Sequence, residues 1–316
     1  MTFLLFAAVA CVAFTNGANA NFKGVASLYG SGTTSLRVAA WWGTAATFAG
    51  SLASLFLASG MLTAFRGRGV VADELTASQA FVTAVALGAA VTSFLATRLG
   101  FPVSTTHALV GGLVGAGLAA GGGVKLAPLA TAFLYPLFFS PLASAVAGGL
   151  VYLLLRAARL APARRTPLLD VVHFLSTGAA SFARGLNDTP KMVALLLVVP
   201  GVGVPPAFAT VAATIALGGL LDARRVGETL GKKVTGMNPG QGFAASLVTA
   251  GLVATASLHS LPVSTTHVSV GSLLGMGVVT RQARWRTVWE ILAAWVTTVP
   301  CGGVLAAAAY QLVGGG

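Results

Sequence analysis

Long apolar stretches alternate with short polar segments along the whole chain. The apolar stretches cover residues 2–15, 36–62, 77–96, 126–155, 168–183, 207–221, 243–258 and 288–312. A helix needs roughly 20 mostly apolar residues to cross the hydrocarbon core of a bilayer. The pattern therefore predicts an all-α polytopic membrane protein, surrounded by a lipid bilayer over most of its surface.

The composition supports this prediction and removes a competing one. The 316 residues are 56% hydrophobic and only 8% charged, whereas soluble domains carry about 25% charged residues. A net charge of +12 would also suit a nucleic-acid partner. The basic residues lie in short loops between the apolar stretches, however, as the positive-inside rule places them. We therefore expect no nucleic-acid partner.

A 17-residue segment occurs twice. Residues 101–117 and 261–277 are identical at 11 of 17 positions and share the hexapeptide P-V-S-T-T-H. Such a match marks an internal repeat. Each copy places three hydroxyl groups and an imidazole beside a proline, within an otherwise apolar run.

These hydroxyl groups are candidates for binding an oxyanion. Ser and Thr often cap the first turn of a helix, and proline suits the same place. The start of a helix carries free N–H groups and a partial positive charge, which together favour anions. The hydroxyls could instead only bond the backbone or hold helices together, but their duplication favours binding. The candidates are Ser104, Thr105, Thr106, Ser264, Thr265 and Thr266.

A second pair of polar segments precedes these motifs. Residues 16–23 read N-G-A-N-A-N-F-K and residues 184–191 read R-G-L-N-D-T-P-K. Aligning them pairs Asn19 with Asn187, Ala20 with Asp188, and Lys23 with Lys191. The polar residues also predict that the first membrane helix unwinds at 16–21. A cleaved signal peptide is the alternative for the first segment, but no Lys or Arg precedes its apolar run.

Asp188 is the most informative member of these segments. A carboxylate within an apolar region is costly and indicates function, so we expect Asp188 to bind a small cation or to accept a proton. The alternative is an ion pair with Arg184 or Lys191, one helical turn away. His107 and His267 have no acidic or Cys partner at a metal spacing, which favours a structural hydrogen-bonding role for both.

Loop charges predict the topology. The loops at 66–74 and 121–125 carry net charges of 0 and +1, whereas those at 156–165, 222–233 and 281–286 carry +4, +2 and +3. Placing the basic loops in the cytoplasm gives three net crossings per half and puts both termini outside. The halves, 1–160 and 161–316, then form two inverted-topology repeats. Broken helices and re-entrant helical hairpins in such repeats are typical of transporters.

Together the four motifs resemble those of the inorganic phosphate transporter (PiT) family, and the chain is similar to a bacterial member. The resemblance implies symport of inorganic phosphate, coupled to sodium or protons, by an elevator-like homodimer in the inner (plasma) membrane. It implies no cofactor beyond a coupling sodium ion. It assigns phosphate to the six hydroxyl residues above and Asp188. The implied sodium ligands are Asn19, Asn21, Asn187, Asp188, Thr105 and Thr265.

One position departs from the family pattern. Ala20 stands where the first signature has Asp, so one of two expected carboxylates is absent and sodium dependence should be weaker. Sulfate has no proton to donate, and transport of sulfate is therefore the alternative. A passive anion channel is a third hypothesis for the function. A membrane hydrolase using Ser and His would need one asymmetric site with a paired base, so the duplication argues against an enzyme.

Overall fold

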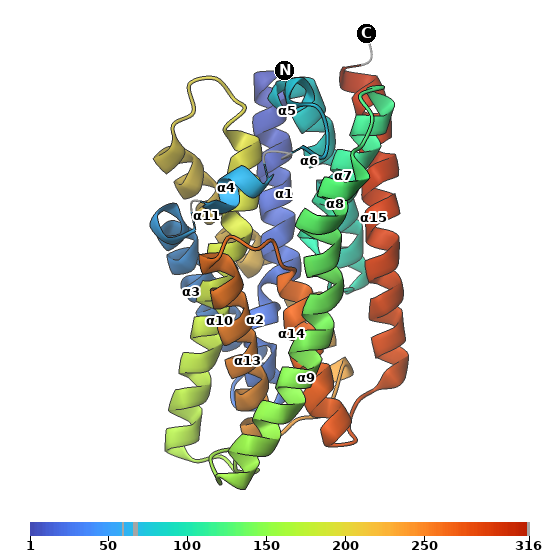
Figure 1. Cartoon of the computed structure of the whole chain (residues 1–316). Helices are drawn as coiled ribbons and strands as arrows, with labels where there is room; N and C mark the ends of the chain where they lie inside the picture. Colours follow the sequence, from blue (N-terminus) through green and yellow to red (C-terminus); the bar gives the residue numbers. More distant parts are fainter. Residues whose placement is uncertain (59, 66–68, 315–316) are drawn as a thin grey trace.

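A computed structural model describes residues 1–58, 60–65 and 69–314 (Figure 1). These residues form helices and loops, with one isolated β-bridge between Thr235 and Ala283. The helices of the first half are α1 (Thr2–Ala20), α2 (Phe22–Gly30), α3 (Leu36–Leu57), α4 (Gly60–Phe65), α5 (Asp73–Ala77), α6 (Gln79–Leu99), α7 (Thr105–Ala119), α8 (Leu126–Leu129), the π-helix η1 (Ala130–Leu134) and α9 (Tyr135–Ala157).

The second half contains a similar set of helices. They are α10 (Pro167–Leu196), α11 (Val204–Leu221), α12 (Arg224–Glu228), the π-helix η2 (Thr229–Lys233), α13 (Pro239–Leu258), α14 (Thr265–Val279) and α15 (Trp285–Val313). Six helical segments of the described chain are long and apolar enough to cross a membrane. The all-α membrane fold predicted from the apolar pattern is therefore confirmed.

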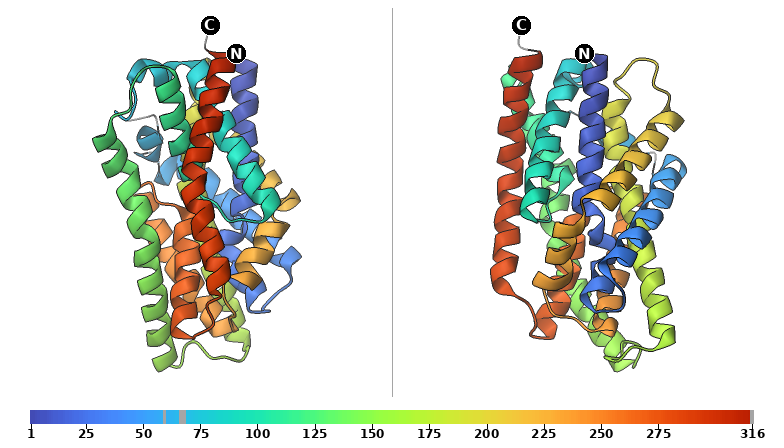
Figure 2. Two further views of the ribbon diagram at one scale, coloured as in Figure 1. Left: turned by 90° about the vertical axis from the view of Figure 1, so that its right-hand side faces the viewer. Right: turned by 180° about the vertical axis from the view of Figure 1, so that it is seen from behind.

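The two halves run in opposite directions. The N-terminus and the C-terminus lie at one end of the molecule, and the loop between α9 and α10 lies at the other (Figures 1 and 2). The first half thus travels from one end to the opposite end, and the second half returns. Three net crossings per half would produce this arrangement.

Each P-V-S-T-T-H motif forms the turn of a helical hairpin. Helix α6 ends at Leu99 and is followed by Gly100, whose φ of 78° is left-handed, and Ser260 takes a similar φ of 56° after α13. Glycine adopts this conformation readily, whereas other residues do so less often. The hairpin α6–α7 enters from the end that holds the termini and α13–α14 from the opposite end, so their turns face each other near the middle (Figure 2).

The expected unwinding at residues 16–21 is wrong. Helix α1 continues to Ala20, Asn21 has helical dihedral angles of −55° and −43°, and α2 follows. Helix α10 likewise runs unbroken through Asp188. Side chains supply the reason: the amides of Asn16 and Asn19 bond hydroxyl groups on neighbouring helices. The buried amides of Asn16 and Asn19 are therefore satisfied without opening the backbone.

Candidate functional site

Four elements bring their polar residues together in the interior: α1–α2, α10, and the first turns of α7 and α14. Asp188 on α10 lies at the centre of this cluster. Its Oδ1 accepts a hydrogen bond from Lys191 Nζ at 3.0 Å. Its Oδ2 lies 3.3 Å from both Asn16 Nδ2 and Thr265 Oγ1 and 3.6 Å from Arg184 Nε. The carboxylate therefore joins both halves of the chain, and the ion pairs with Arg184 and Lys191 are both present.

Asn16 and Arg184 belong to this cluster, although sequence analysis did not propose them as ligands. Arg184 donates to Asn16 Oδ1 and to Thr47 Oγ1, each at 3.1 Å, and Asn16 Nδ2 donates to Thr105 Oγ1 at 3.0 Å. The internal repeat could have pointed to both residues from the sequence alone. The alignment that pairs Asn19 with Asn187 also pairs Asn16 with Arg184, and a buried arginine in an apolar stretch is as costly as a buried carboxylate.

The two lysines occupy corresponding places. Lys191 Nζ donates to Val263 O at 3.2 Å, to Thr106 Oγ1 at 2.9 Å and to Asn187 Oδ1 at 2.6 Å. Lys23 Nζ donates to Val103 O at 2.9 Å. Val103 and Val263 are the same position of the two P-V-S-T-T-H motifs, so each lysine holds the turn of one hairpin. Both lysines are buried, which rules out snorkelling to the membrane surface.

The paired asparagines also hold the hairpin turns. Asn19 donates to Thr97 Oγ1 at 3.0 Å and accepts from the Val103 N–H at 3.0 Å. Asn187 donates to Ser257 Oγ at 3.1 Å, and Ser257 corresponds to Thr97 in the repeat. Asn21 is not brought to the cluster, because its amide donates to Ala40 O, Thr44 Oγ1 and Gly219 O on the other side of the helix.

The serines of both motifs act as helix caps. The hydroxyls of Ser104 and Ser264 accept from the His107 and His267 N–H groups, each at 3.2 Å. Thr266 Oγ1 donates across the halves to Val103 O at 2.7 Å. His267 Nδ1 lies 2.9 Å from Leu137 O, as expected of a structural histidine, whereas His107 Nδ1 has no hydrogen-bond partner in the described chain. The two imidazole rings lie side by side, with their centroids 4.6 Å apart.

The cluster carries an excess of positive charge. Lys23, Arg184, Lys191 and Asp188 are the buried charged residues of the described chain, and three cations against one carboxylate leave a net charge of +2. Buried charges are costly unless they are paired. Both Asp188 oxygens already accept hydrogen bonds or ion pairs, so a cation bound at Asp188 would have to displace Lys191 or Arg184. The arrangement therefore fits an anion more directly than a cation.

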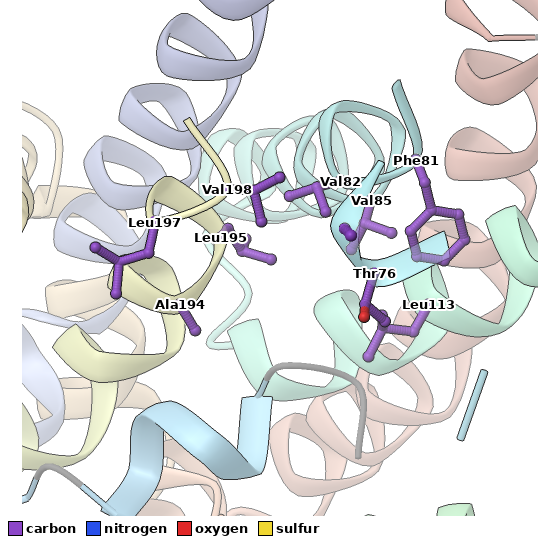
Figure 3. Close-up of a pocket in the computed structure, with 10 residues that line it drawn as sticks. Thr76, Phe81, Val82, Val85, Leu113, Ala194, Leu195, Leu197 and Val198 are labelled. Carbon is purple, nitrogen blue, oxygen red and sulfur yellow. The ribbon is translucent and has the colours of Figure 1, made fainter. Parts of the chain in front are cut away.

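A cavity opens beyond the cluster toward the end that holds the termini. It has a volume of about 400 Å³ and is lined by α5, α6, α7 and the end of α10. Figure 3 shows its residues, among them Leu195 and Val85, which face a common space. Leu195 lies seven residues beyond Asp188, about 10 Å along the helix axis. The cavity thus approaches the charged cluster from one end of the molecule.

A much smaller void, of about 10 Å³, lies in the corresponding place on the other side and is just large enough for a single water molecule. It is lined by α2, α13 and α14, and the repeat relates its Ser27, Ala245 and Leu273 to Leu195, Val85 and Leu113 of the first cavity. The two linings differ in chemistry. The first is mostly apolar, whereas the second holds five hydroxyl residues: Ser27, Ser246, Thr249, Ser269 and Ser272.

Comparison with known proteins places this site in a family. The profile described as "phosphate transporter family" matches residues 16–167 and again residues 156–306. The chain belongs to the phosphate transporter family. The two matches cover both halves, and the residues of the charged cluster fall within them. As a family member the protein is a membrane transport protein and not an enzyme.

Curated relatives from several bacteria are similar over most of their length. A protein from Mycobacterium bovis, described as "probable low-affinity inorganic phosphate transporter", is 30% identical to this chain. The alignment covers 98% of this chain and 77% of the relative. The one from Rhizobium meliloti is also 30% identical, covering 94% and 92%. The one from Bacillus subtilis is 28% identical, covering 73% and 74%. The sequence similarity of this family member to its relatives therefore extends over nearly the whole chain.

A solved structure shares the fold. The structure described as "the sodium-dependent phosphate transporter" superimposes with a TM-score of 0.81 at 23% identity and covers 98% of each chain. The arrangement of helices in this family member is therefore that of a known transporter. The expected family resemblance and the fold class are both confirmed.

Proposed function

We propose that the protein is a secondary active transporter that carries inorganic phosphate across the plasma membrane together with a cation, sodium or a proton. The relatives' descriptions name inorganic phosphate, and that of the solved structure names sodium. The observation that carries the proposal is the meeting of two hydroxyl-capped helix starts at a buried cluster with a net charge of +2.

Phosphate binding falls to the first turns of α7 and α14 and to the cations beside them. The free N–H groups of the two helix starts and the hydroxyls of Thr105 and Thr265 supply hydrogen bonds to phosphate oxygens. Lys191 and Arg184 supply charge, and Asp188 holds these two cations in place. The full set of proposed phosphate ligands is Ser104, Thr105, Thr106, Asp188, Ser264, Thr265 and Thr266.

The coupling cation needs oxygen ligands beside this anion site. Hard cations are bound by carboxylate, carbonyl and amide oxygens. Asn19, Asn187 and Asp188 offer such oxygens around the hairpin turns, with Thr105 and Thr265 close to Asp188. Asn21 offers a side-chain oxygen that has no hydrogen-bond partner in the described chain, but it faces α3 and α11. The proposed sodium ligands thus centre on Asp188.

The two halves, 1–160 and 161–316, are proposed to act as inverted repeats, with both termini outside and the protein working as a homodimer. The cavity and the small void at repeat-related positions support the inverted repeats. One leads toward the end with the termini, and the other lies on the opposite side of the cluster. Alternating access would widen the void into a second path while the cavity closes.

Uptake into proteoliposomes tests the proposal. Purified protein is reconstituted and labelled phosphate uptake is measured with an inward sodium gradient, an inward proton gradient, both, or neither. We expect phosphate to be concentrated above its external level when a cation gradient is present. Uptake that only equilibrates phosphate would indicate a passive channel, and no phosphate uptake in any condition would contradict the proposal.

Sulfate is a second candidate, favoured by one observation. Ala20 is fully buried where the repeat places a carboxylate, so the site has one acceptor fewer for the proton that phosphate carries. Labelled sulfate uptake, and inhibition of phosphate uptake by unlabelled sulfate, distinguish the two. Faster uptake of phosphate than of sulfate would support phosphate as the substrate, whereas equal uptake would show that the site does not distinguish the two anions.

A further inference from the structure

Lys23 is the buried cation that the proposed transport cycle does not yet use. Its side chain is only 4% exposed, and its ammonium group donates to Val103 O at 2.9 Å. No carboxylate of the described chain lies within 4.0 Å of it. A buried charge without a partner of opposite sign is costly. The fold tolerates this charge, which suggests that a ligand of opposite charge completes the environment.

The repeat shows how the surroundings of Lys23 differ from those of Lys191. In the second half, Lys191 and Asp188 form an i, i+3 ion pair at 3.0 Å, and the same lysine donates to Val263 O. In the first half, Lys23 makes the equivalent bond to Val103 O, but the position of the carboxylate is Ala20. The pair of Lys191 and Asp188 is thus neutral, although Arg184 leaves the second half with one excess positive charge. In the first half, Lys23 has no carboxylate beside it.

The surroundings of Lys23 suit a polar ligand. Lys23 lines the small void together with the five hydroxyl residues named above. Thr266 donates to the same Val103 carbonyl as Lys23 does, so the ammonium group also lies beside the first turn of α14. Hydroxyl groups and a lysine therefore line this small void, and the lysine also lies beside a helix start.

We propose that Lys23 is a resident counter-ion of the transported anion, and that it takes the place of a dissolved cation in the first half of the protein. This inference rests on the proposed anion transport. Phosphate above its second pKa, like sulfate, carries two negative charges, which match the net charge of +2 on the cluster. A dianion then binds with its charge balanced by the protein, and no sodium ion is required beside Ala20.

Four variants test this proposal by phosphate affinity. Binding of labelled phosphate is measured in detergent with and without sodium, with choline keeping the ionic strength constant. Lys23→Gln should lower affinity about ten- to hundredfold, and Lys23→Arg should keep most of it. Ala20→Asp should also lower affinity, since the new carboxylate pairs with Lys23. Ala20→Asp combined with Lys23→Gln should bind phosphate only when sodium is present.

The exposed Lys125 supplies a matched control, because Lys125→Gln removes the same charge far from the cluster. A size-exclusion profile and an unfolding temperature for each variant separate loss of fold from loss of binding. If the parent binds phosphate or sulfate and Lys23→Gln binds it equally well, Lys23 is not a counter-ion, although anion transport stands. If the parent binds neither anion, the proposed function fails and this inference fails with it.

Discussion

At the scale of single residues, Asp188 holds most of the charged cluster together. It accepts from Lys191, Asn16 and Thr265 and pairs with Arg184, so four side chains from three helices depend on one carboxylate. Breaking a buried ion pair by removing one partner costs about 3–5 kcal/mol. Removing Asp188 should therefore destabilise the fold as well as impair transport.

Asp188→Asn should lower the unfolding temperature in detergent markedly, because Lys191 and Arg184 then remain buried beside a neutral amide. Adding Lys191→Met should restore part of the loss, since one uncompensated charge is removed. Asp170→Asn is the control on the same helix. Asp170 pairs with Arg165 at the surface, where ion pairs contribute little. Equal unfolding temperatures for Asp188→Asn and Asp170→Asn would contradict this account of the cluster.

At the scale of helices, glycines set how closely the hairpins pack. A Cβ at Gly115 would lie against the Gly303 carbonyl, and one at Gly275 against the Ala145 carbonyl, both well inside van der Waals contact. Helix α7 therefore touches α15, and α14 touches α9, through backbone atoms. Small residues permit this approach in membrane helices, so both contacts depend on glycine.

Gly275→Ala should destabilise the protein by about 1–3 kcal/mol, the usual cost of overpacking, and should slow uptake by shifting α14 away from α9. The unfolding temperature and the initial uptake rate measure the two effects. Gly251 in α13 is the matched control, since a Cβ there meets no atom within 4 Å and alanine favours a helix. Equal unfolding temperatures and uptake rates for the two variants would show that the α9–α14 contact tolerates a methyl group.

Sequence patterns predicted the hairpins well because their signals are local. Proline, a capping serine and a preceding Gly100 mark the end of one helix and the start of the next within a few residues. The continuity of α1 into α2 was not predictable in this way. Whether Asn16 and Asn19 unwind a helix depends on the hydroxyls of Thr105 and Thr97, which lie about 80 to 90 residues away in the chain.

In the candidate site, too, the sequence predicted local features but not contacts between residues that are distant in the chain. The hydroxyls, Asp188 and the two lysines could be named from the sequence, because each is a polar residue in an apolar stretch, and the hydroxyls and lysines also recur in the repeat. The place of Asn21 could not, since a rotation of about 100° per residue on a helix turns it toward α3 and α11. The sharing of Asp188 among donors from both halves is likewise visible only in three dimensions.

At the scale of the whole molecule, the position of the termini relative to the α9–α10 loop can be tested. Both termini lie at one end and this loop at the other (Figure 1), and the basic residues of 156–165 favour a cytoplasmic loop. Cys11 and Cys301 are first replaced by serine, and single cysteines are then placed at Gly122 or Arg164. A membrane-impermeant maleimide should label Gly122→Cys in intact cells and Arg164→Cys only after permeabilisation. Labelling of Arg164→Cys in intact cells would indicate the opposite topology, with the α9–α10 loop outside.

The missing carboxylate at Ala20 has an electrical consequence. A charge fixed to the protein, such as that of Lys23, crosses with the anion and returns with the empty carrier, so it adds nothing to the charge moved per cycle. A dissolved cation that crosses with the anion does add to it, by about 2.3 kcal/mol per charge at 100 mV. Each co-transported cation replaced by a fixed one would therefore reduce the phosphate gradient that a membrane potential of this size can sustain by about 50-fold.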